Sequence, residues 1–244
     1  MRLFGLIGNP LTHSFSKTYF TQKFSSLNLS DCAYENFELE TIDQLKDLID
    51  SNAQLQGLNV TIPYKEKVFS FLKEQDDVVK KIGACNCIKI IDGALYGYNT
   101  DVTGFEKALL PFLKMQHTNA LVLGTGGASK AVQFVLKKLG IDYLLVSRSG
   151  EEGTVNYDKL SKSILQSHKI IINTTPLGTF PKVEDYPPIP YQYLTPAHLL
   201  YDLVYNPATT TFLNKGSANG AAITNGFAML VAQAEESWNI WESY

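Results

Sequence analysis

Two patterns of apolar positions, continuous short runs and helical spacing, alternate along the chain and together predict a mixed α/β fold. Short apolar runs typical of buried strands occupy residues 2–8, 34–37, 57–62, 88–91, 94–98, 120–123, 143–146, 169–173, 199–203 and 221–224. Helical spacing of apolar residues occupies 16–25, 42–49, 101–110, 131–139, 209–215 and 226–241. Asp92-Gly93 lies between two of the strand-like runs and predicts a tight hairpin of type I′.

The most informative stretch is the apolar run 120–123 with the glycine-rich turn that follows it. Gly124-Thr-Gly126-Gly-Ala-Ser leads into helical spacing that ends at Gly140, and a second apolar run follows. Strand, glycine turn, helix and strand within about 30 residues form the context of a dinucleotide-binding loop. Gly124 permits a tight turn, Gly126 lets the backbone approach a pyrophosphate, and the helix N-terminus attracts phosphate. The alternative is a tight turn between strand and helix that binds no ligand.

The end of the next strand indicates which dinucleotide would bind. An NAD site usually has an acidic residue there, to bind the ribose 2′-hydroxyl. Here the strand ends in Ser147-Arg148-Ser149, and the first acid is Glu151. A planar guanidinium with neighbouring hydroxyls suits a 2′-phosphate, which favours NADP. The alternative is that Arg148 is an ordinary exposed loop arginine.

Polar residues in three other places are candidates for chemistry. Ser14 and Ser16 lie near the start of the helix expected at 16–25, either as helix caps or as hydroxyls presented to a polyol or carboxylate. Lys65 follows the carboxyl end of a strand, where ligands of α/β sheets bind, and is expected to open a helix. A lysine suits a helix N-terminus poorly, which favours another role over that of a solvated side chain. Asp101 could cap the next helix, and Gln233 could be a surface glutamine.

Composition restricts the class of protein. Of 244 residues, 45% are hydrophobic and 18% charged, as in an ordinary globular protein. A net charge of −3 argues against binding nucleic acid through phosphate contacts. We expect no membrane partner and no signal peptide, because no apolar run approaches the ~20 residues of a membrane span. Three cysteines suggest a reducing cytoplasm, and Cys85-x-Cys87 lacks the partners for a metal site.

Seven motifs, in order and across nearly the whole chain, resemble those of the shikimate dehydrogenase family. They are Gly8-Asn9-Pro10 with His13-Ser14-Phe15-Ser16, Asn59-Val60-Thr61-Ile62-Pro63-Tyr64-Lys65, Gly83-Ala84-Cys85-Asn86, Asn99-Thr100-Asp101 with Gly104, Gly124 to Ala128, Tyr201-Asp202 with Tyr205 and Pro207, and Gly226 with Met229-Leu230 and Gln233. Seven ordered motifs are far more specific than the glycine turn alone.

The resemblance implies an α/β fold of two lobes. An N-terminal α/β substrate domain would span residues 1–101, a Rossmann-type dinucleotide-binding domain residues 102–225, and a C-terminal helix, 226–244, would return to pack on the first lobe. The implied activity is the reversible reduction of 3-dehydroshikimate to shikimate with NADPH, in aromatic amino-acid biosynthesis. The implied partners are a small-molecule substrate and NADP(H), in a cytoplasmic monomer or homodimer.

The family's functional residues carry over position by position. The catalytic pair would be Lys65 and Asp101. The implied substrate-binding residues are Ser14, Ser16, Thr61, Lys65, Asn86, Asp101, Tyr205 and Gln233. The implied cofactor-binding residues are Asp77, Gly124, Thr125, Gly126, Gly127, Ala128, Ser147, Arg148, Ser149, Thr174, Leu203 and Gly226.

Some positions depart from the family pattern, and three rival functions stay open. Lys17 stands where a proline is frequent, Cys87 where a threonine is frequent, and Ser147-Arg148-Ser149 where Asn-Arg-Thr is usual. The rivals are a quinate or dual quinate/shikimate dehydrogenase, another two-lobe NADP enzyme with a catalytic lysine such as methylenetetrahydrofolate dehydrogenase, and a non-catalytic ligand sensor. The presence of both Lys65 and Asp101 argues against the sensor, which needs neither.

Overall fold

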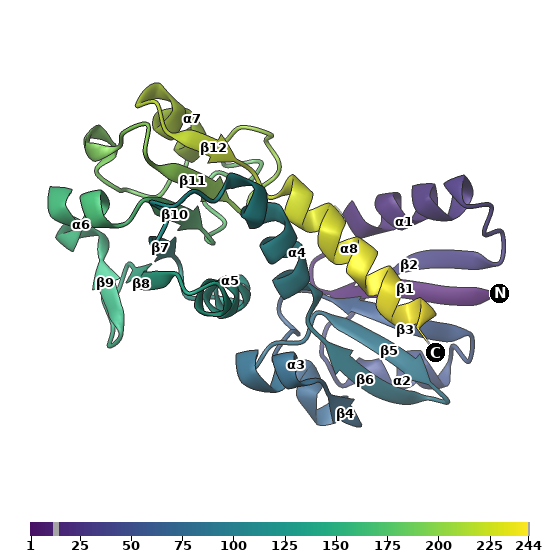
Figure 1. Ribbon diagram of the computed structural model, residues 1–244. Coiled ribbons are helices and arrows are strands. Elements are labelled where there is room, and N and C mark those ends of the chain that lie inside the picture. The colour runs from purple at the N-terminus through teal and green to yellow at the C-terminus, as the bar shows by residue number, and fades with distance from the viewer. Residues whose placement is uncertain (12–14, 244) are drawn as a thin grey trace. The chain divides into compact units, whose positions relative to one another are not determined.

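A computed structural model describes residues 1–11 and 15–243 and divides the chain into two compact α/β units, each with its own sheet (Figure 1). Unit 1 comprises Met1–Thr100 and Ala234–Tyr244, and unit 2 comprises Asp101–Gln233. Both boundaries fall inside helices, the first in α4 (Thr100–Leu109) and the second in α8 (Phe227–Glu242). The predicted α/β fold class is confirmed.

Unit 1 is built on a mixed sheet of six strands in the order β2-β1-β3-β5-β6-β4. The strands are β1 (Arg2–Gly8), β2 (Cys32–Glu38), β3 (Leu55–Val60), β4 (Glu74–Gln75), β5 (Cys87–Ile91) and β6 (Ala94–Tyr98). β1 pairs in parallel with β2 and β3, whereas β5 runs antiparallel to both β3 and β6. The turn between β5 and β6 has positive φ angles of 50° at Asp92 and 76° at Gly93, which confirms the predicted hairpin.

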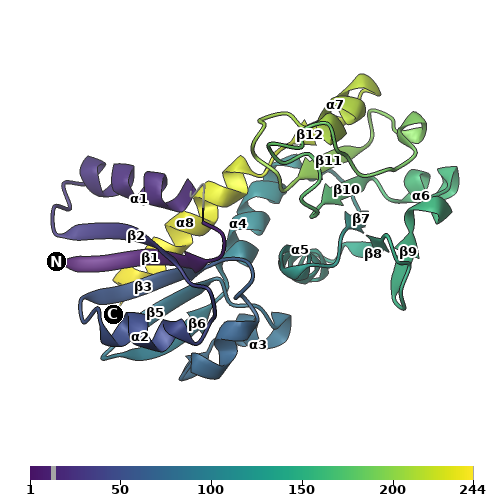
Figure 2. The same cartoon turned by 180° about the vertical axis from the view of Figure 1, so that it is seen from behind.

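Helices cover both faces of the unit 1 sheet (Figures 1 and 2). One face packs against α1 (Phe15–Ser26) and the last turns of α8, the other against α2 (Gln44–Asp50) and the 3₁₀ helix η1 (Lys67–Phe71). The core between the sheet, α1 and α8 is aromatic, and its packed rings are Phe4, Phe20, Phe24, Tyr34, Trp238 and Trp241. The short helix α3 (Asp77–Ile82) precedes β5.

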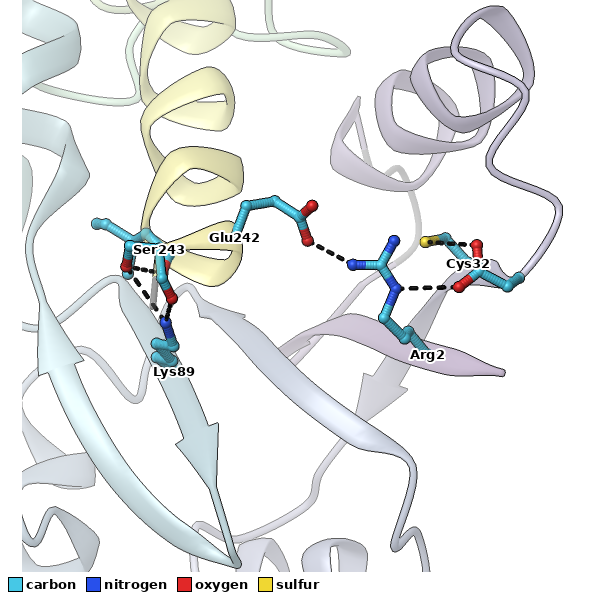
Figure 3. Close-up of polar contacts among 7 residues, drawn as sticks. Arg2, Cys32, Lys89, Glu242 and Ser243 are labelled. Carbon is cyan, nitrogen blue, oxygen red and sulfur yellow. Dashed lines mark hydrogen bonds and ion pairs between the residues drawn. The ribbon is translucent and has the colours of Figure 1, made fainter.

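The end of α8 is fastened to unit 1 by polar contacts (Figure 3). The Arg2 guanidinium on β1 pairs with the Glu242 carboxylate, and Nζ of Lys89 on β5 donates to the carbonyl oxygen of Ser243. The buried indoles of Trp238 and Trp241 belong to the unit 1 core, and these polar contacts hold the exposed end of the helix beside it.

Unit 2 has a fully parallel six-stranded sheet in the order β12-β11-β10-β7-β8-β9. Its strands are β7 (Asn119–Leu123), β8 (Asp142–Ser147), β9 (Thr154–Asn156), β10 (Ile170–Asn173), β11 (Leu199–Asp202) and β12 (Ala222–Thr224). Its other helices are α5 (Gly127–Lys138), α6 (Lys162–Ser167) and α7 (Thr211–Ala218), with 3₁₀ turns η2 (Leu110–Phe112), η3 (Tyr157–Lys159) and η4 (Tyr191–Tyr193). Counted from β7, the order is 3-2-1-4-5-6, that of the doubly wound dinucleotide-binding fold.

Tyr201 on β11 provides a test of the unit 2 core. Its hydroxyl is buried and has no hydrogen-bond partner among the described residues, while its ring meets Phe105 edge-on at 5.1 Å. We expect Tyr201→Phe to raise the free energy of unfolding by about 1 kcal/mol, because it removes an unsatisfied buried hydroxyl and keeps the ring. Urea denaturation measures the change.

The matched control is Tyr34→Phe in unit 1. The Tyr34 hydroxyl is also buried but donates to Oδ1 of Asn59 at 2.8 Å. Removing that hydroxyl leaves a buried acceptor unsatisfied, so the control should lose about 1–2 kcal/mol. An equal loss in both variants would contradict the reading of the Tyr201 hydroxyl.

Candidate functional site

The predicted glycine turn lies at the switch point of the unit 2 sheet, between β7 and β10. Gly124 has a φ of +108°, and a Cβ built on it would lie 2.7 Å from Oγ1 of Thr174, in the loop after β10. This backbone conformation favours glycine, as the sequence predicts.

The start of α5 fits a phosphate group. Gly126 occupies the N-cap position and provides no side-chain cap, and the first turn has no acidic residue. A Cβ built on Gly126 or Gly127 would meet nothing within 4 Å, so the first N–H groups of the helix are open to an anion. Ser129 is fully buried where a third glycine is usual, and its hydroxyl accepts from Gln133. Thr125 and Ala128 lie in the same turn.

The turn after β8 exposes Arg148. Ser147 is buried, and its hydroxyl accepts from the N–H of Gly150 at 3.0 Å and lies 2.8 Å from Oγ1 of Thr154. The carbonyl oxygen of Arg148 accepts from Asn156 at 2.7 Å, which leaves the guanidinium and Ser149 exposed. This position suits a 2′-phosphate but also a solvated arginine, so the NADP-binding role of Arg148 stays a prediction.

Three further predicted cofactor residues lie in the loops after β10, β11 and β12. Thr174 donates through Oγ1 to the carbonyl of Leu123 at 2.7 Å. Leu203 donates through its N–H to the carbonyl of Asn173 at 3.0 Å, and Gly226 donates to the carbonyl of Val204 at 3.2 Å. All three therefore lie at the same carboxyl edge of the sheet as the glycine turn.

Lys65 lies in a turn after β3, and the helix predicted to begin at Tyr64 is wrong. The chain forms instead a turn at residues 65 and 66 and a 3₁₀ helix from Lys67. Lys65 is half-buried, and its carbonyl oxygen accepts from the N–H of Cys85 at 2.8 Å. Its backbone is thus joined to the segment that carries Asn86.

Asn86 joins this segment to the start of α4. Its Oδ1 accepts from the N–H of Thr100 at 2.6 Å, and its Nδ2 donates to Oγ1 of Thr100 at 3.0 Å. Asp101 follows Thr100 directly in the first turn of α4 and is only 7% exposed. Since the helix begins at Thr100, the alternative that Asp101 is a helix cap is wrong. A short run of hydrogen bonds therefore links the backbone of Lys65 to the residue before Asp101.

A buried network of polar side chains, which sequence reasoning missed, contacts Thr100 at the start of α4. The Tyr34 hydroxyl donates to Asn59, whose Nδ2 donates to the hydroxyl of Ser237 at 2.9 Å. The Ser237 hydroxyl lies 3.3 Å from that of Thr100. Ser16, the second residue of α1, hydrogen-bonds the Tyr34 hydroxyl. The predicted residue Ser14 lies outside the described residues.

Gln233 is 8% exposed, so the alternative of a surface glutamine is wrong. Within unit 2, α8 crosses α4 at Gly104, where an added Cβ would lie 2.7 Å from the carbonyl oxygen of Met229 and 2.9 Å from Cβ of Gln233. Asp101 lies one helical turn before Gly104. Asp101 and Gln233 are therefore neighbours at the helix crossing.

Three predicted residues lie at the margins of these groups. Thr61 donates through its N–H to the carbonyl of Ile7 at 2.9 Å, at the carboxyl edge of the unit 1 sheet. Asp77 begins α3, with its side chain 87% exposed and 3.8 Å from Nζ of Lys80. Tyr205 lies in the loop after β11 and is 36% exposed. The roles of all three stay predictions.

Among residues 1–11 and 15–243, His, Cys, Asp and Glu side chains form no group of three that could hold a metal ion. Within the same part of the chain, no helix combines the length and apolar character needed to cross a bilayer.

Burial raises the pKa of the Cys85 thiol to about 12, which keeps it protonated.

Comparison with known proteins identifies relatives over nearly the full length. The family model described as the shikimate dehydrogenase substrate binding domain matches residues 6–88. A protein of Clostridium beijerinckii named shikimate dehydrogenase (NADP(+)) is 39% identical, over 99% of this chain and 92% of its own. One of Methanosphaera stadtmanae with the same name is 33% identical, over 97% and 90%. The crystal structure of the Thermus thermophilus shikimate 5-dehydrogenase with NADP(H) and shikimate superposes with a TM-score of 0.87, at 27% identity over 99% and 94%.

Unit 2 has a doubly wound sheet with an open glycine turn, and unit 1 is a second α/β unit with a half-buried lysine. These features are typical of the class of two-domain dinucleotide-dependent dehydrogenases. The curated relatives show which family of this class the chain belongs to. The chain belongs to the shikimate dehydrogenase family.

Proposed function

We propose that this chain catalyses the reversible NADP-dependent reduction of 3-dehydroshikimate to shikimate. The observation that supports the proposal is the hydrogen-bonded run from the carbonyl of Lys65 through Cys85 and Asn86 to Thr100, the residue before Asp101. Relatives that share this family over more than nine-tenths of the chain carry the name of that activity.

When bound, NADP(H) supplies the hydride for the ketone carbon or accepts it from the alcohol. Lys65 as an ammonium donates a proton to the developing alkoxide oxygen and stabilises its charge. In the direction of shikimate oxidation, the same nitrogen accepts the hydroxyl proton. Asp101, held in the first turn of α4, orients the substrate hydroxyl.

Hydroxyl and amide side chains hold the rest of the substrate. A cyclic polyol with one carboxylate needs several donors and acceptors, because each of its polar groups leaves water on binding. The residues assigned to this role are Ser14, Ser16, Thr61, Asn86, Tyr205 and Gln233. The burial of Asn86 and Gln233 supports the assignment, since both are fixed before a ligand arrives.

NADP(H) is assigned to unit 2. The uncapped N-terminus of α5 suits the pyrophosphate, and exposed Arg148 at the end of β8 suits the 2′-phosphate. The remaining assigned residues follow the strands of the same sheet edge or, for Asp77, begin α3. We further propose a cytoplasmic enzyme that acts as a monomer or a homodimer.

The test measures NADPH formation at 340 nm with the purified chain and shikimate. We expect turnover with NADP⁺ and shikimate, and a much lower kcat/KM when NAD⁺ replaces NADP⁺ or quinate replaces shikimate. Comparable turnover of quinate would indicate the dual dehydrogenase. Binding of shikimate without turnover would indicate the ligand sensor, and no effect of shikimate at all would contradict the proposal.

A further inference from the structure

A buried carboxylate at the carboxyl end of β11 takes no part in the chemistry proposed above. Asp202 is fully buried and accepts three hydrogen bonds. Its Oδ1 accepts from Nδ2 of Asn173 at 2.9 Å and from the N–H of Val204 at 3.0 Å, and its Oδ2 accepts from Oγ1 of Thr210 at 2.5 Å. Tyr191 is the titratable neighbour whose own ionisation Asp202 disfavours.

Two of the donors, Val204 and Thr210, follow β11 in the sequence, and the Val204 bond fixes the loop directly after that strand. The N–H of Val204 is held by Asp202, and the carbonyl of Val204 in turn accepts from Gly226, at the start of α8. Leu203 lies between Asp202 and Val204, and its N–H donates to the carbonyl of Asn173. The carboxylate therefore holds Val204, which follows Leu203 in the chain and accepts from Gly226, and these two residues are assigned to the cofactor.

The third neighbour, Asn173, extends the network to the loop after β10. While its Nδ2 is bound to Asp202, its Oδ1 accepts from both the N–H and the hydroxyl of Thr175, at 3.0 and 2.6 Å. Thr174 lies between these two residues and contacts the glycine turn at Gly124. One carboxylate thus joins the loops that follow β10, β11 and β12.

These loops lie on one half of the doubly wound sheet. A dinucleotide extends across the switch point, with one mononucleotide over each half. Arg148 follows β8 and belongs to the half assigned to the 2′-phosphate, whereas β10, β11 and β12 form the other half. The joined loops therefore face the nicotinamide mononucleotide.

Burial makes the charged form of this carboxylate costly. Desolvation by burial raises the pKa of Asp202 from 3.8 to about 6, against the lowering effect of its three donors. A raised pKa in the folded state means that folding favours the protonated form. Stability contributed by this group is therefore complete at low pH and is lost as the pH rises from about 4 through about 6. At neutral pH the ionised side chain therefore contributes less to the stability of the fold than the protonated form does at low pH.

We propose that Asp202 is a positioning residue for the cofactor: it holds the loops that carry Thr174, Leu203 and Gly226 in the conformation that receives the nicotinamide half of NADP(H). The inference rests on the proposed function, because it takes unit 2 as the NADP(H) site. Because Asp202 acts through hydrogen bonds, the isosteric amide of asparagine should preserve its function.

The experiment compares dissociation constants for NADPH and NADH by titration calorimetry of the full chain. Asp202→Ala should raise both constants by the same factor, about tenfold, because the affected loops contact a part that both cofactors share. Asp202→Asn should stay within about twofold of the wild-type constants, since its oxygen keeps the Asn173 and Val204 bonds and its amide donates to Thr210. Asp142→Ala, at the exposed start of β8, is the matched control and should change neither constant.

Thermal unfolding of the same variants separates positioning from a purely structural role. Asp202→Asn should melt no lower than the wild type at pH 7.5. A folded Asp202→Ala with unchanged constants, a change confined to NADPH, or an Asp202→Asn as weak as Asp202→Ala would overturn the inference. If Asp202→Ala does not fold, Asn173→Ala breaks the same network and should weaken both cofactors equally; unchanged constants there also overturn it. A wild-type chain that binds neither cofactor would instead refute the proposed function.

Discussion

Replacing Lys65 by alanine should lower kcat for shikimate oxidation at least about 100-fold, with a modest change in the KM for shikimate. The reason is that the substitution removes the group that transfers the hydroxyl proton and stabilises the alkoxide, whereas several other side chains keep the substrate bound. The backbone bond from Cys85 to the carbonyl of residue 65 does not depend on the side chain, so the turn should persist. Initial rates under saturating NADP⁺ measure the effect.

Lys67→Ala is the matched control for this variant. Lys67 begins η1 two residues further along, carries the same charge and is exposed. Its loss should leave kcat and KM near their wild-type values. A Lys65→Ala enzyme with near-normal kcat would end the assignment of proton transfer to this lysine, and an equal fall in both variants would point to local misfolding.

Replacing Arg148 by alanine should raise the KM for NADPH about tenfold or more and leave the KM for NADH almost unchanged. A guanidinium bound to a phosphate forms charge-assisted hydrogen bonds, which contribute about 1.5–3 kcal/mol. NADH lacks the 2′-phosphate and cannot lose that contribution. Steady-state kinetics of 3-dehydroshikimate reduction with each cofactor gives the two constants.

The exposed residue Lys159, on the same unit at the end of η3, supplies the control for a general charge effect. Lys159→Ala removes one positive charge without touching the end of β8, and both KM values should hold. If Arg148→Ala weakens NADPH and NADH to the same extent, Arg148 supports the turn rather than the 2′-phosphate. The outcome also differs from that expected for Asp202→Ala, which should affect both cofactors.

The sequence was sufficient to predict the features that depend on local periodicity. The strand, glycine turn, helix and strand of residues 119–147 form as expected, because each element is specified by its own apolar spacing and by glycines at the required positions. The Asp92-Gly93 hairpin forms for the same reason. Periodicity also placed the final amphipathic helix, whose indoles pack in unit 1.

Features that depend on contacts between distant segments could not be predicted. The network of Tyr34, Asn59, Ser237 and Thr100 includes a bond between residues 178 positions apart, and although Asn59 and Thr100 belong to motifs, nothing in the sequence shows that these four side chains meet. Gln233 looked like a surface residue because burial at a helix crossing leaves no local signature. Asp202 gave one usable signal, an acid at the end of an otherwise apolar strand, but only the structure shows its three donors.

The two ends of the chain are both needed to complete unit 1, and this has a consequence for biosynthesis. Phe4, Phe20 and Phe24 are synthesised before unit 2, whereas the indoles of Trp238 and Trp241 that cover them are synthesised after it. Unit 2 consists of one continuous segment and has all its strands before residue 225. Until the segment from Ala234 onward has left the ribosome, the aromatic surface of the first part of unit 1 therefore stays uncovered, whatever the state of unit 2.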